Sequence, residues 1–291
     1  MAMATVAFAA LDATAKYLVG VDHVPVAEVV WLRFVAHVLF SLVVLWPFAL
    51  KPSFQSKKPA LQILRSLLML GSTGFNFVAL KYLQLDQTVT IFFLTPLLVA
   101  ALAGPLLDEW VGWHRMIAIG VGLLGVMIVM RPGFGGVHWA VTLSLCATLS
   151  YALYNLSTRY LAGFDPPEVT QSYSPLVGVA LMAPLALLHW QWPQDWTTWL
   201  ALASLGIWGG LGHWLLILAH RWAPAPVLAP FIYLGLISMS ALGYLLFGDV
   251  PTAWTLAGGA VVILSGLYLL ARERRWAGPR GAGPASDIAS Q

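Results

Sequence analysis

Long apolar runs dominate this chain, and short clusters of charged, proline or glycine residues separate each run from the next. A helix needs about 20 apolar residues to cross a bilayer core about 30 Å thick. Cutting the chain at the clusters predicts ten membrane-spanning helices, at 2–20, 27–50, 60–82, 85–107, 112–130, 138–161, 167–189, 197–219, 223–247 and 252–271. The loops are too short for a soluble domain, and the tail 273–291, rich in Gly, Pro and Ser, is expected to be disordered.

The amino-acid composition also indicates a membrane protein. Hydrophobic residues make up 59% of the 291 residues and charged residues only 9%, whereas about a quarter of a soluble domain is charged. So few charges cannot cover a soluble surface, which excludes an ordinary soluble enzyme, a nucleic-acid-binding protein and a disordered chain. The single cysteine, Cys146, excludes an intrachain disulfide and a thiolate metal site of its own.

The distribution of basic residues predicts the orientation, because Lys and Arg concentrate in cytoplasmic loops. Ten spans place both termini on one side. If that side is the cytoplasm, the outside holds two basic loop residues, Lys81 and Arg131. The inside then holds eleven: Lys51, Lys57, Lys58, Arg65, Arg115, Arg159, Arg221, Arg272, Arg274, Arg275 and Arg280. We therefore expect a multi-pass protein of a bacterial-type inner membrane with both termini in the cytoplasm.

Sequence similarity at an offset of about 140 residues divides the chain into two repeats, 1–131 and 137–272. Glu28 matches Glu168, Lys81 matches Arg221, and Leu107-Asp108-Glu109 matches Phe247-Gly248-Asp249. Each repeat holds five spans, an odd number, so the second must enter the membrane from the opposite side. The expected fold is thus all-α, with ten transmembrane helices as two inverted five-helix repeats. Such an architecture is typical of transporters that bind substrate between the halves.

Several motifs also resemble a known family. They are Ala9-Ala10-Leu11-Asp12-Ala13-Thr14-Ala15-Lys16-Tyr17-Leu18, Glu28 with Trp31-Leu32-Arg33-Phe34, Thr95-Pro96 with Glu109, and the glycine-rich fifth and tenth spans. With these motifs the chain resembles the EamA-like ten-helix transporters of the drug/metabolite transporter superfamily. The resemblance implies a transporter rather than an enzyme. Some members export amino acids, including aromatic amino acid exporters of the YddG type, and others import nucleoside-type metabolites such as S-adenosylmethionine. In the second half Leu236 and Tyr173 replace Pro96 and Arg33.

Polar and aromatic side chains inside spans are the candidates for substrate binding, because polar groups are expensive in lipid. Ten are predicted to bind substrate: Asp12, Asn76, Thr95, Tyr151, Tyr154, Asn155, Trp208, His213, Trp214 and Tyr233. Asp12 could instead form a self-neutralising pair with Lys16, four residues away on one helix face. The aromatic residues could stack on a flat substrate or an organic cation, or simply face lipid. Close helix packing explains Gly209 and Gly210 well, and His213 beside Trp214 less well.

Six further residues are predicted to have structural or gating roles: Lys16, Arg33, His37, Pro96, Pro175 and Pro230. Lys16 is expected to extend toward the outer surface. Arg33 could pair with Asp12 or Glu28 and fix the helix orientation, or bind an anion. His37 could titrate near neutral pH or simply form a hydrogen bond. The prolines predict kinks, either hinges for alternating access or static bends.

No nucleotide-binding, zinc-protease or serine-hydrolase motif is present in the sequence. We therefore expect no cofactor and no metal, and transport driven by a substrate or ion gradient. The prediction is a secondary transporter that works by alternating access, binds a small metabolite within membrane lipid, and is a monomer or weak homodimer without a nucleic-acid partner. Amino acid export, aromatic or neutral, is favoured. The alternatives are uptake of S-adenosylmethionine or a similar metabolite, cationic-drug efflux, a channel or a membrane enzyme.

Overall fold

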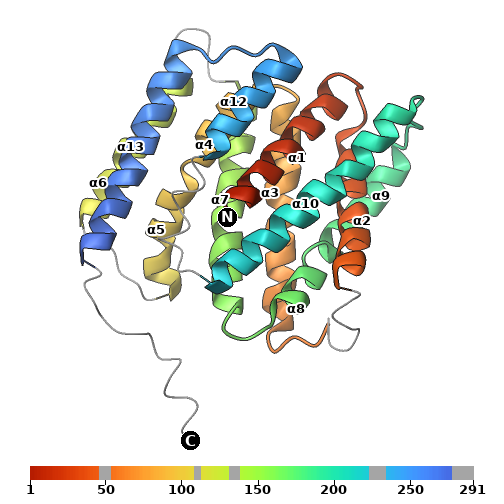
Figure 1. Cartoon of the computed structure of the whole chain (residues 1–291), viewed down its shortest axis with the longest axis horizontal. Helices are drawn as coiled ribbons and strands as arrows, with labels where there is room; N and C mark the ends of the chain where they lie inside the picture. Colours follow the sequence, from red (N-terminus) through yellow and green to blue (C-terminus); the bar gives the residue numbers. More distant parts are fainter. Residues whose placement is uncertain (46–53, 108–112, 131–137, 223–233, 277–291) are drawn as a thin grey trace, which may run out of the picture.

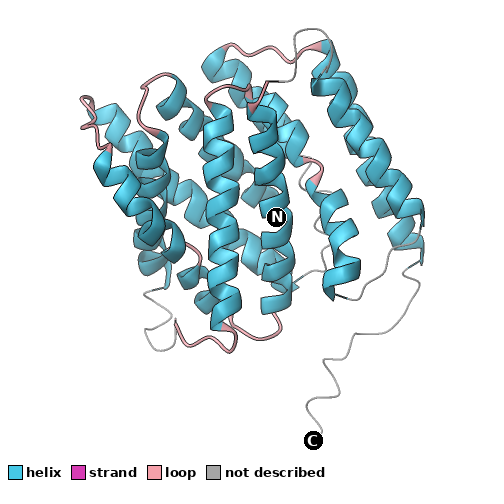
Figure 2. Cartoon of the chain, turned by 180° about the vertical axis from the view of Figure 1, so that it is seen from behind, coloured by secondary structure: helices cyan, strands magenta, loops and turns pink. Residues whose placement is uncertain are grey.

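The computed structural model describes residues 1–45, 54–107, 113–130, 138–222 and 234–276. Within these ranges all regular secondary structure is helical (Figure 2). The first half holds α1 (Ala2–Gly20), α2 (Val26–Leu45), α3 (Pro59–Leu80), α4 (Leu85–Phe92), α5 (Thr95–Leu107) and α6 (Trp113–Met130) (Figure 1). The second half holds α7 (Ala140–Leu161), α8 (Pro167–Tyr173), α9 (Leu176–Leu188), α10 (Trp196–Trp222), α12 (Leu234–Phe247) and α13 (Ala253–Trp276).

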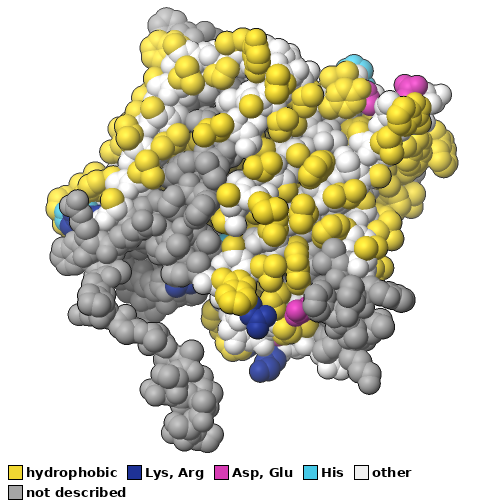
Figure 3. All heavy atoms as spheres, in the orientation of Figure 1, with side chains coloured by type: hydrophobic (Ala, Val, Ile, Leu, Met, Phe, Trp, Pro, Cys, Tyr) yellow, Lys and Arg dark blue, Asp and Glu magenta, His cyan; other side chains and the backbone are white. Residues whose placement is uncertain are grey.

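Length and hydropathy identify the helices that cross the membrane. Five stretches are long and apolar enough: α1, residues 26–43 of α2, α3, residues 167–188 over α8 and α9, and α10. Shorter apolar helices lie at 87–99, 116–128, 237–247 and 253–268. Hydrophobic side chains spread over the face shown in Figure 3, and most visible charged side chains lie near its upper and lower ends. The predicted class, an all-α membrane protein, is confirmed.

Two of the predicted spans are broken into two helices each. The span 85–107 is interrupted at residues 93 and 94 between α4 and α5, and the span 167–189 at residues 174 and 175 between α8 and α9. Pro96 is the second residue of α5 and Pro175 directly precedes α9. Proline suits the first turn of a helix because no intrahelical partner awaits its missing N–H. These two prolines therefore begin new helices and do not kink continuous ones, while Pro230 lies outside the described residues.

The break between α8 and α9 is not repeated in the first half, and the counterpart of the break between α4 and α5, at 233 and 234, falls at the edge of the described residues. At the offset of 140 residues, Ser174 corresponds to Phe34, which lies inside the continuous helix α2. Discontinuous helices are common beside transporter binding sites, where irregular backbone can border a cavity. Within the described residues, the halves thus differ at the span that α8 and α9 form, whose counterpart α2 is continuous.

Glycines set the contact between α10 and α2. A Cβ atom at Gly206 would lie 2.2 Å from the Cβ of Ala36, and one at Gly210 would lie 2.3 Å from the ring of Phe40. Both distances are too short for any real side chain, so these positions must be glycine for α2 to pack this closely. Helix packing therefore explains this part of the glycine-rich run.

Helices α6 and α13 form a separate pair at the side of the bundle (Figure 1). A Cβ at Gly125 of α6 would lie 2.8 Å from the carbonyl oxygen of Gly258 and 2.7 Å from Val262 on α13. Ser265 also donates a hydrogen bond of 2.5 Å to the carbonyl of Ala118 across the same contact. The glycine-rich helices of the two halves therefore pack directly on each other.

Candidate functional site

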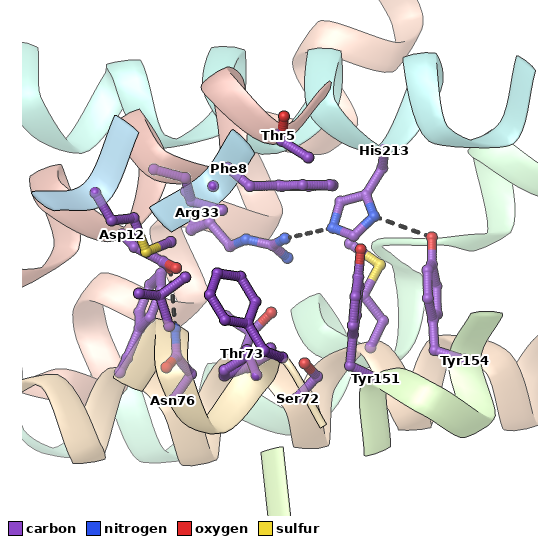
Figure 4. A pocket seen from close by; sticks show the side chains of 18 of the residues that line it. Thr5, Phe8, Asp12, Arg33, Ser72, Thr73, Asn76, Tyr151, Tyr154 and His213 are labelled. Carbon is purple, nitrogen blue, oxygen red and sulfur yellow. Dashed lines mark hydrogen bonds between the residues drawn. The ribbon is translucent and has the colours of Figure 1, made fainter. Parts of the chain in front are cut away.

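A cavity lies between the two halves of the bundle. Helices α1 to α4 line it from the first half, and α7, α10 and α12 from the second (Figure 4). The space between its lining atoms is about 820 Å³, including its opening. Its lining combines charged, polar and aromatic side chains, as pockets for organic ligands do.

One end of the cavity carries Asp12 and Asn76. The Asn76 Nδ2 group donates a hydrogen bond of 2.9 Å to Asp12 Oδ1, which joins α1 to α3. Asn76 is 5% exposed, and its own Oδ1 has no partner among the described residues. A carboxylate can accept hydrogen bonds at both oxygens. This end of the cavity is therefore rich in acceptors and suits a cationic or N–H-bearing group.

Lys16 does not pair with Asp12, so the predicted self-neutralising pair is wrong. Lys16 Nζ instead lies 2.6 Å from Asp249 Oδ2, in the link between α12 and α13, and 4.9 Å from the centre of the Phe247 ring. Gln84 Nε2 reaches the other oxygen of Asp249 at 3.5 Å. We call the Lys16–Asp249 pair the upper tie, because it joins the two halves at the upper end of the bundle in Figure 1.

Arg33 lies at the centre of the cavity. Its side chain is 1% exposed, and Nη2 donates a hydrogen bond of 2.9 Å to His213 Nε2. Its Nε and Nη1 have no partner in the described part of the chain. Gly209 on α10 provides the room, because a Cβ there would lie 3.3 Å from Arg33 Nε. Two unpartnered guanidinium donors beside a cavity suit a carboxylate or a carbonyl oxygen.

Arg33 does not form the predicted pair with Glu28. Glu28 is fully buried, and its Oε2 accepts a hydrogen bond of 3.1 Å from the backbone N–H of Gln191. His37 lies outside the cavity wall described here, accepts a hydrogen bond of 2.8 Å from Gln171 Nε2, and stacks on His213 with ring centres 5.7 Å apart.

Aromatic rings form the part of the cavity wall around His213. The Phe8 ring lies edge-on to Tyr151 at 6.4 Å, and Phe92 lies 5.9 Å from Tyr151 on another side. Tyr151 and Tyr154 stack with ring centres 6.0 Å apart, and Phe8 contacts His213 at 4.9 Å. Stacking and edge contacts of this kind favour a flat, conjugated ligand.

The structure brings together half of the ten residues that the sequence predicts to bind substrate. The five that line the cavity are Asp12, Asn76, Tyr151, Tyr154 and His213. The described cavity wall does not include Thr95, Asn155, Trp208 or Trp214. Asn155 donates to the carbonyl of Tyr151 on its own helix at 2.7 Å, Thr95 is buried, and both tryptophans are half-buried. Tyr233 lies outside the described residues.

Sequence reasoning missed several residues in or behind the cavity wall, among them Phe8, Phe92 and Arg65. Phe8 and Phe92 line the cavity, yet an apolar aromatic residue in an apolar span looks the same whether it faces lipid or substrate. Arg65, counted above among the loop cations, is fully buried inside the bundle. It donates hydrogen bonds of 2.7 Å to Thr158 Oγ1 and to Ser174 Oγ. The position of Arg65 within the predicted third span, 60–82, was the sequence signal that could have identified it as buried.

A second cluster joins the halves at the lower end of the bundle in Figure 1, and we call it the lower tie. Asp165, which follows α7, is 5% exposed. It accepts hydrogen bonds from three groups of the first half, at 2.5, 2.8 and 2.8 Å: Ser56 Oγ, the backbone N–H of Lys57 and Gln62 Nε2. Burial by itself raises the pKa of Asp165, but these hydrogen bonds outweigh burial and lower it below the ordinary value.

Comparison with known proteins identifies the family. The sequence model of the EamA-like transporter family matches residues 1–131 and 138–272. The riboflavin transporter of Vibrio cholerae serotype O1 is 27% identical over 276 residues, which cover 94% of this chain and 93% of that protein. The S-adenosylmethionine uptake transporter of Rickettsia bellii is 28% identical over 280 residues, which cover 94% and 92%.

More distant similarities agree with this assignment. The pseudopaline exporter CntI of Pseudomonas aeruginosa is 21% identical over 198 residues, which cover 66% of this chain and 68% of that protein. A solved structure titled "Crystal structure of protein" matches with a TM-score of 0.64 and 19% identity over 95% of this chain and 99% of that chain, which shows a shared fold. The chain is a membrane transporter and belongs to the EamA-like transporter family.

Proposed function

We propose that this transporter carries an organic metabolite in which a flat ring system is joined to a zwitterionic amino-acid head, with S-adenosylmethionine as the first candidate. One observation carries the proposal. A single cavity between the halves contains a guanidinium with unpartnered donors, Arg33, a carboxylate, Asp12, and the ring faces of Phe8, Phe92 and Tyr151 (Figure 4). Each part of such a metabolite has a chemical counterpart in this set.

The head group fits the two charged residues. A substrate carboxylate can accept hydrogen bonds from Nε and Nη1 of Arg33, which are otherwise unpartnered donors. A substrate ammonium can donate to Asp12, and the free Oδ1 of Asn76 can accept a further N–H. In a site of low dielectric a charged group must be paired. A zwitterion satisfies both protein charges at once.

The rest of S-adenosylmethionine fits the aromatic wall. Its adenine is flat and can stack on Tyr151 or lie against the edges of Phe8 and Phe92. Its sulfonium is a permanent cation, which aromatic faces attract through their quadrupoles. The named function of the Rickettsia relatives supports the same choice, because their alignments cover most of this chain. Uptake is accordingly the proposed direction.

Two other substrates can be compared with this one at the same two charged residues. A free aromatic amino acid has the same head on a smaller ring, so export of aromatic amino acids is the second candidate of this class. Riboflavin, named for the Vibrio relative, is flat and has carbonyl oxygens for Arg33. It is uncharged, however, and would leave Asp12 without a cationic partner.

Counterflow in proteoliposomes tests the proposal without assuming a direction or a coupling ion. Vesicles are loaded with unlabelled S-adenosylmethionine, tryptophan or riboflavin, and labelled S-adenosylmethionine is added outside. We expect transient accumulation with the first load and none with riboflavin. Asp12→Asn should reduce counterflow about tenfold or more, because it removes the partner of the ammonium. A parallel experiment uses labelled riboflavin outside riboflavin-loaded vesicles. Accumulation of riboflavin that Asp12→Asn does not affect, without accumulation of S-adenosylmethionine under any load, would overturn the proposal in favour of the neutral substrate.

A further inference from the structure

A chain of buried hydrogen bonds leads from the cavity into the bundle. Arg33 Nη2 contacts His213 Nε2 at 2.9 Å, and His213 Nδ1 contacts Tyr154 Oη at 3.0 Å (Figure 4). The Tyr154 oxygen also accepts a hydrogen bond from Nη2 of Arg65. All four side chains are at most 4% exposed. The chain therefore joins α2, α10, α7 and α3 without a described exit to solvent.

The two arginines fix the direction of every bond in this chain. A guanidinium has donors and no acceptor, so His213 Nε2 must accept from Arg33. A neutral imidazole has one donor and one acceptor, so the proton of His213 is on Nδ1 and is donated to Tyr154. Arg65 can only donate as well, so the Tyr154 oxygen accepts from both sides. The geometry thus selects one of the two neutral tautomers of His213.

Arg65 is held by acceptors that carry no formal charge. Its Nε donates to Thr158 Oγ1, and its Nη1 donates to Ser174 Oγ and, at 3.2 Å, to the carbonyl of Thr170. Among the described residues no carboxylate lies within salt-bridge distance of it. A buried charge without a counter-ion is costly, and an ionisable residue inside a membrane span indicates a functional role by default. Because Arg65 can donate hydrogen bonds but cannot accept one, the Tyr154 oxygen must be the acceptor in their contact.

We infer that Arg65, which does not line the described cavity, is a positioning residue that orients Arg33 toward substrate through Tyr154 and His213. Without the Tyr154 oxygen, the Nδ1 proton of His213 has no acceptor, so only the contact with Arg33 still holds the proton on Nδ1. If the proton moves to Nε2, it faces the donors of Arg33, and the contact that orients the guanidinium is lost. The inference rests on the proposed function, in which Arg33 receives the substrate carboxylate, and extends it to a residue outside the cavity.

The tautomer can be measured without any transport assay. Protein with ¹⁵N-labelled histidine is placed in nanodiscs at a pH where imidazoles are neutral, and long-range ¹H–¹⁵N spectra distinguish a protonated Nδ1 from a protonated Nε2. The chain has seven histidines, so the signals of His213 are assigned by their loss in His213→Gln. We expect the Nδ1–H pattern in the native protein. Tyr154→Phe and Arg65→Gln should each shift it toward Nε2–H.

Tyr151→Phe is the matched control for these spectra. Tyr151 stacks on Tyr154 at 6.0 Å and lines the same cavity, but it is not part of the hydrogen-bond chain. The His213 signals should therefore stay in place in this variant. A native Nε2–H pattern, or signals that do not move in Tyr154→Phe, would overturn the inference. Tyr154→Phe keeps the ring, so the test survives if Arg65→Gln fails to fold.

Transport kinetics then separate positioning from a general loss of structure. The KM for S-adenosylmethionine should rise about tenfold in Tyr154→Phe, while the KM for its decarboxylated analogue changes little, because the analogue lacks the group that Arg33 receives. Equal rises for both compounds would contradict a positioning role. If neither compound is transported by the native protein, the proposed function fails, but the tautomer measurement still decides whether Arg65 controls His213.

Discussion

The upper and lower ties hold the same two halves together but are built from different chemistry. The upper tie is one ion pair, Lys16 with Asp249, whose side chains are 14% and 18% exposed. The lower tie surrounds Asp165, which is 5% exposed, with three donors from the first half. Partly solvated ion pairs contribute little net stability. A buried carboxylate that loses its donors leaves several polar groups unsatisfied.

This difference bears on how the cavity opens. Alternating access requires each end of a carrier to separate in turn while the other stays closed. Separating the halves at the lower tie breaks three hydrogen bonds to the buried Asp165 carboxylate, whereas the upper tie is a partly solvated ion pair with one long hydrogen bond from Gln84 beside it. We therefore expect the upper end to open more readily in the absence of substrate. The predictions below test this asymmetry, from the largest expected effect to the smallest.

Removal of the Asp165 carboxylate should have the largest effect. Asp165→Ala removes the acceptor of Ser56 Oγ, of the Lys57 backbone N–H and of one hydrogen bond from the fully buried Gln62 amide. We expect the free energy of unfolding to fall by about 3 kcal/mol, measured by denaturation in detergent. Asp165→Asn, which retains one acceptor oxygen, should lose about half as much. If Asp165→Ala is as stable as the native protein, the lower tie is not the stronger one.

The same carboxylate predicts a dependence of stability on pH. The pKa of Asp165 is lowered below the ordinary value of 3.8, so the unfolded chain binds its proton more readily than the folded one. The stabilisation is complete above about pH 3.8 and is lost as the pH falls through the lowered value. We expect the Tm gap between the native protein and Asp165→Asn to be widest near neutral pH and to narrow in acid. A gap that is constant with pH would contradict this.

Weakening the upper tie should have a smaller effect on stability, but a measurable effect on how readily a reagent reaches the cavity. Lys16→Ala should destabilise the protein by about 1 kcal/mol or less, because the pair is partly solvated. In a Cys146→Ala background, a cysteine in place of Ser72 reports access to the cavity. A membrane-impermeant thiol reagent should modify this cysteine faster in Lys16→Ala than in the native protein. The increase should occur only when the reagent is added from one side of oriented vesicles. Asp165→Ala should speed the modification from the opposite side.

A charge swap provides the control for the upper tie. Lys16→Asp combined with Asp249→Lys restores opposite charges at the same two positions. The double variant should recover most of the access pattern of the native protein, whereas each single change should not. If the double variant resembles the single ones, the position of the side chains matters more than the attraction between them.

The sequence predicted the spans well and the ties poorly, for physical reasons. Membrane thickness fixes the length of a span, so interruptions in apolar runs locate helix ends to within a few residues. The pairing of Lys16 was missed because Asp249 is 233 residues away, while Asp12 stands at a favourable local spacing. Local spacing indicates which residues can meet on one helix and gives no information on partners from another.

The prediction of the cavity residues was limited in the same way, because the sequence does not show which helices face each other. Asp12, Asn76 and His213 could be identified because polar groups are rare inside spans and need partners there. Phe8 was not identifiable, because a phenylalanine satisfies lipid and substrate equally well. The breaks near Pro96 and Pro175 were read as kinks, since the sequence marks a disturbed helix without showing whether it bends or ends. Tertiary packing decides whether a phenylalanine faces lipid or the cavity, and whether a disturbed helix bends or ends.

A substitution between the two ties should give the smallest effect and show that the cavity can be altered without disturbing either end. A Cβ at Gly209 would lie 3.3 Å from Nε and 3.4 Å from Nη2 of Arg33, so Gly209→Ala should displace the guanidinium by a few tenths of an ångström. We expect the KM to rise about threefold with little change in Tm, since such shifts weaken a charged hydrogen bond only in part.

Gly74→Ala is its matched control, because a Cβ at Gly74 meets nothing within 4 Å and alanine favours the helix. It should leave KM unchanged and keep or slightly raise Tm. Access to a cysteine at position 72 should remain as in the native protein in Gly209→Ala, because both ties are intact. Altered access in this variant would mean that the orientation of Arg33 is coupled to the ends of the bundle, and the asymmetry between the ties could then no longer be assigned to the ties alone.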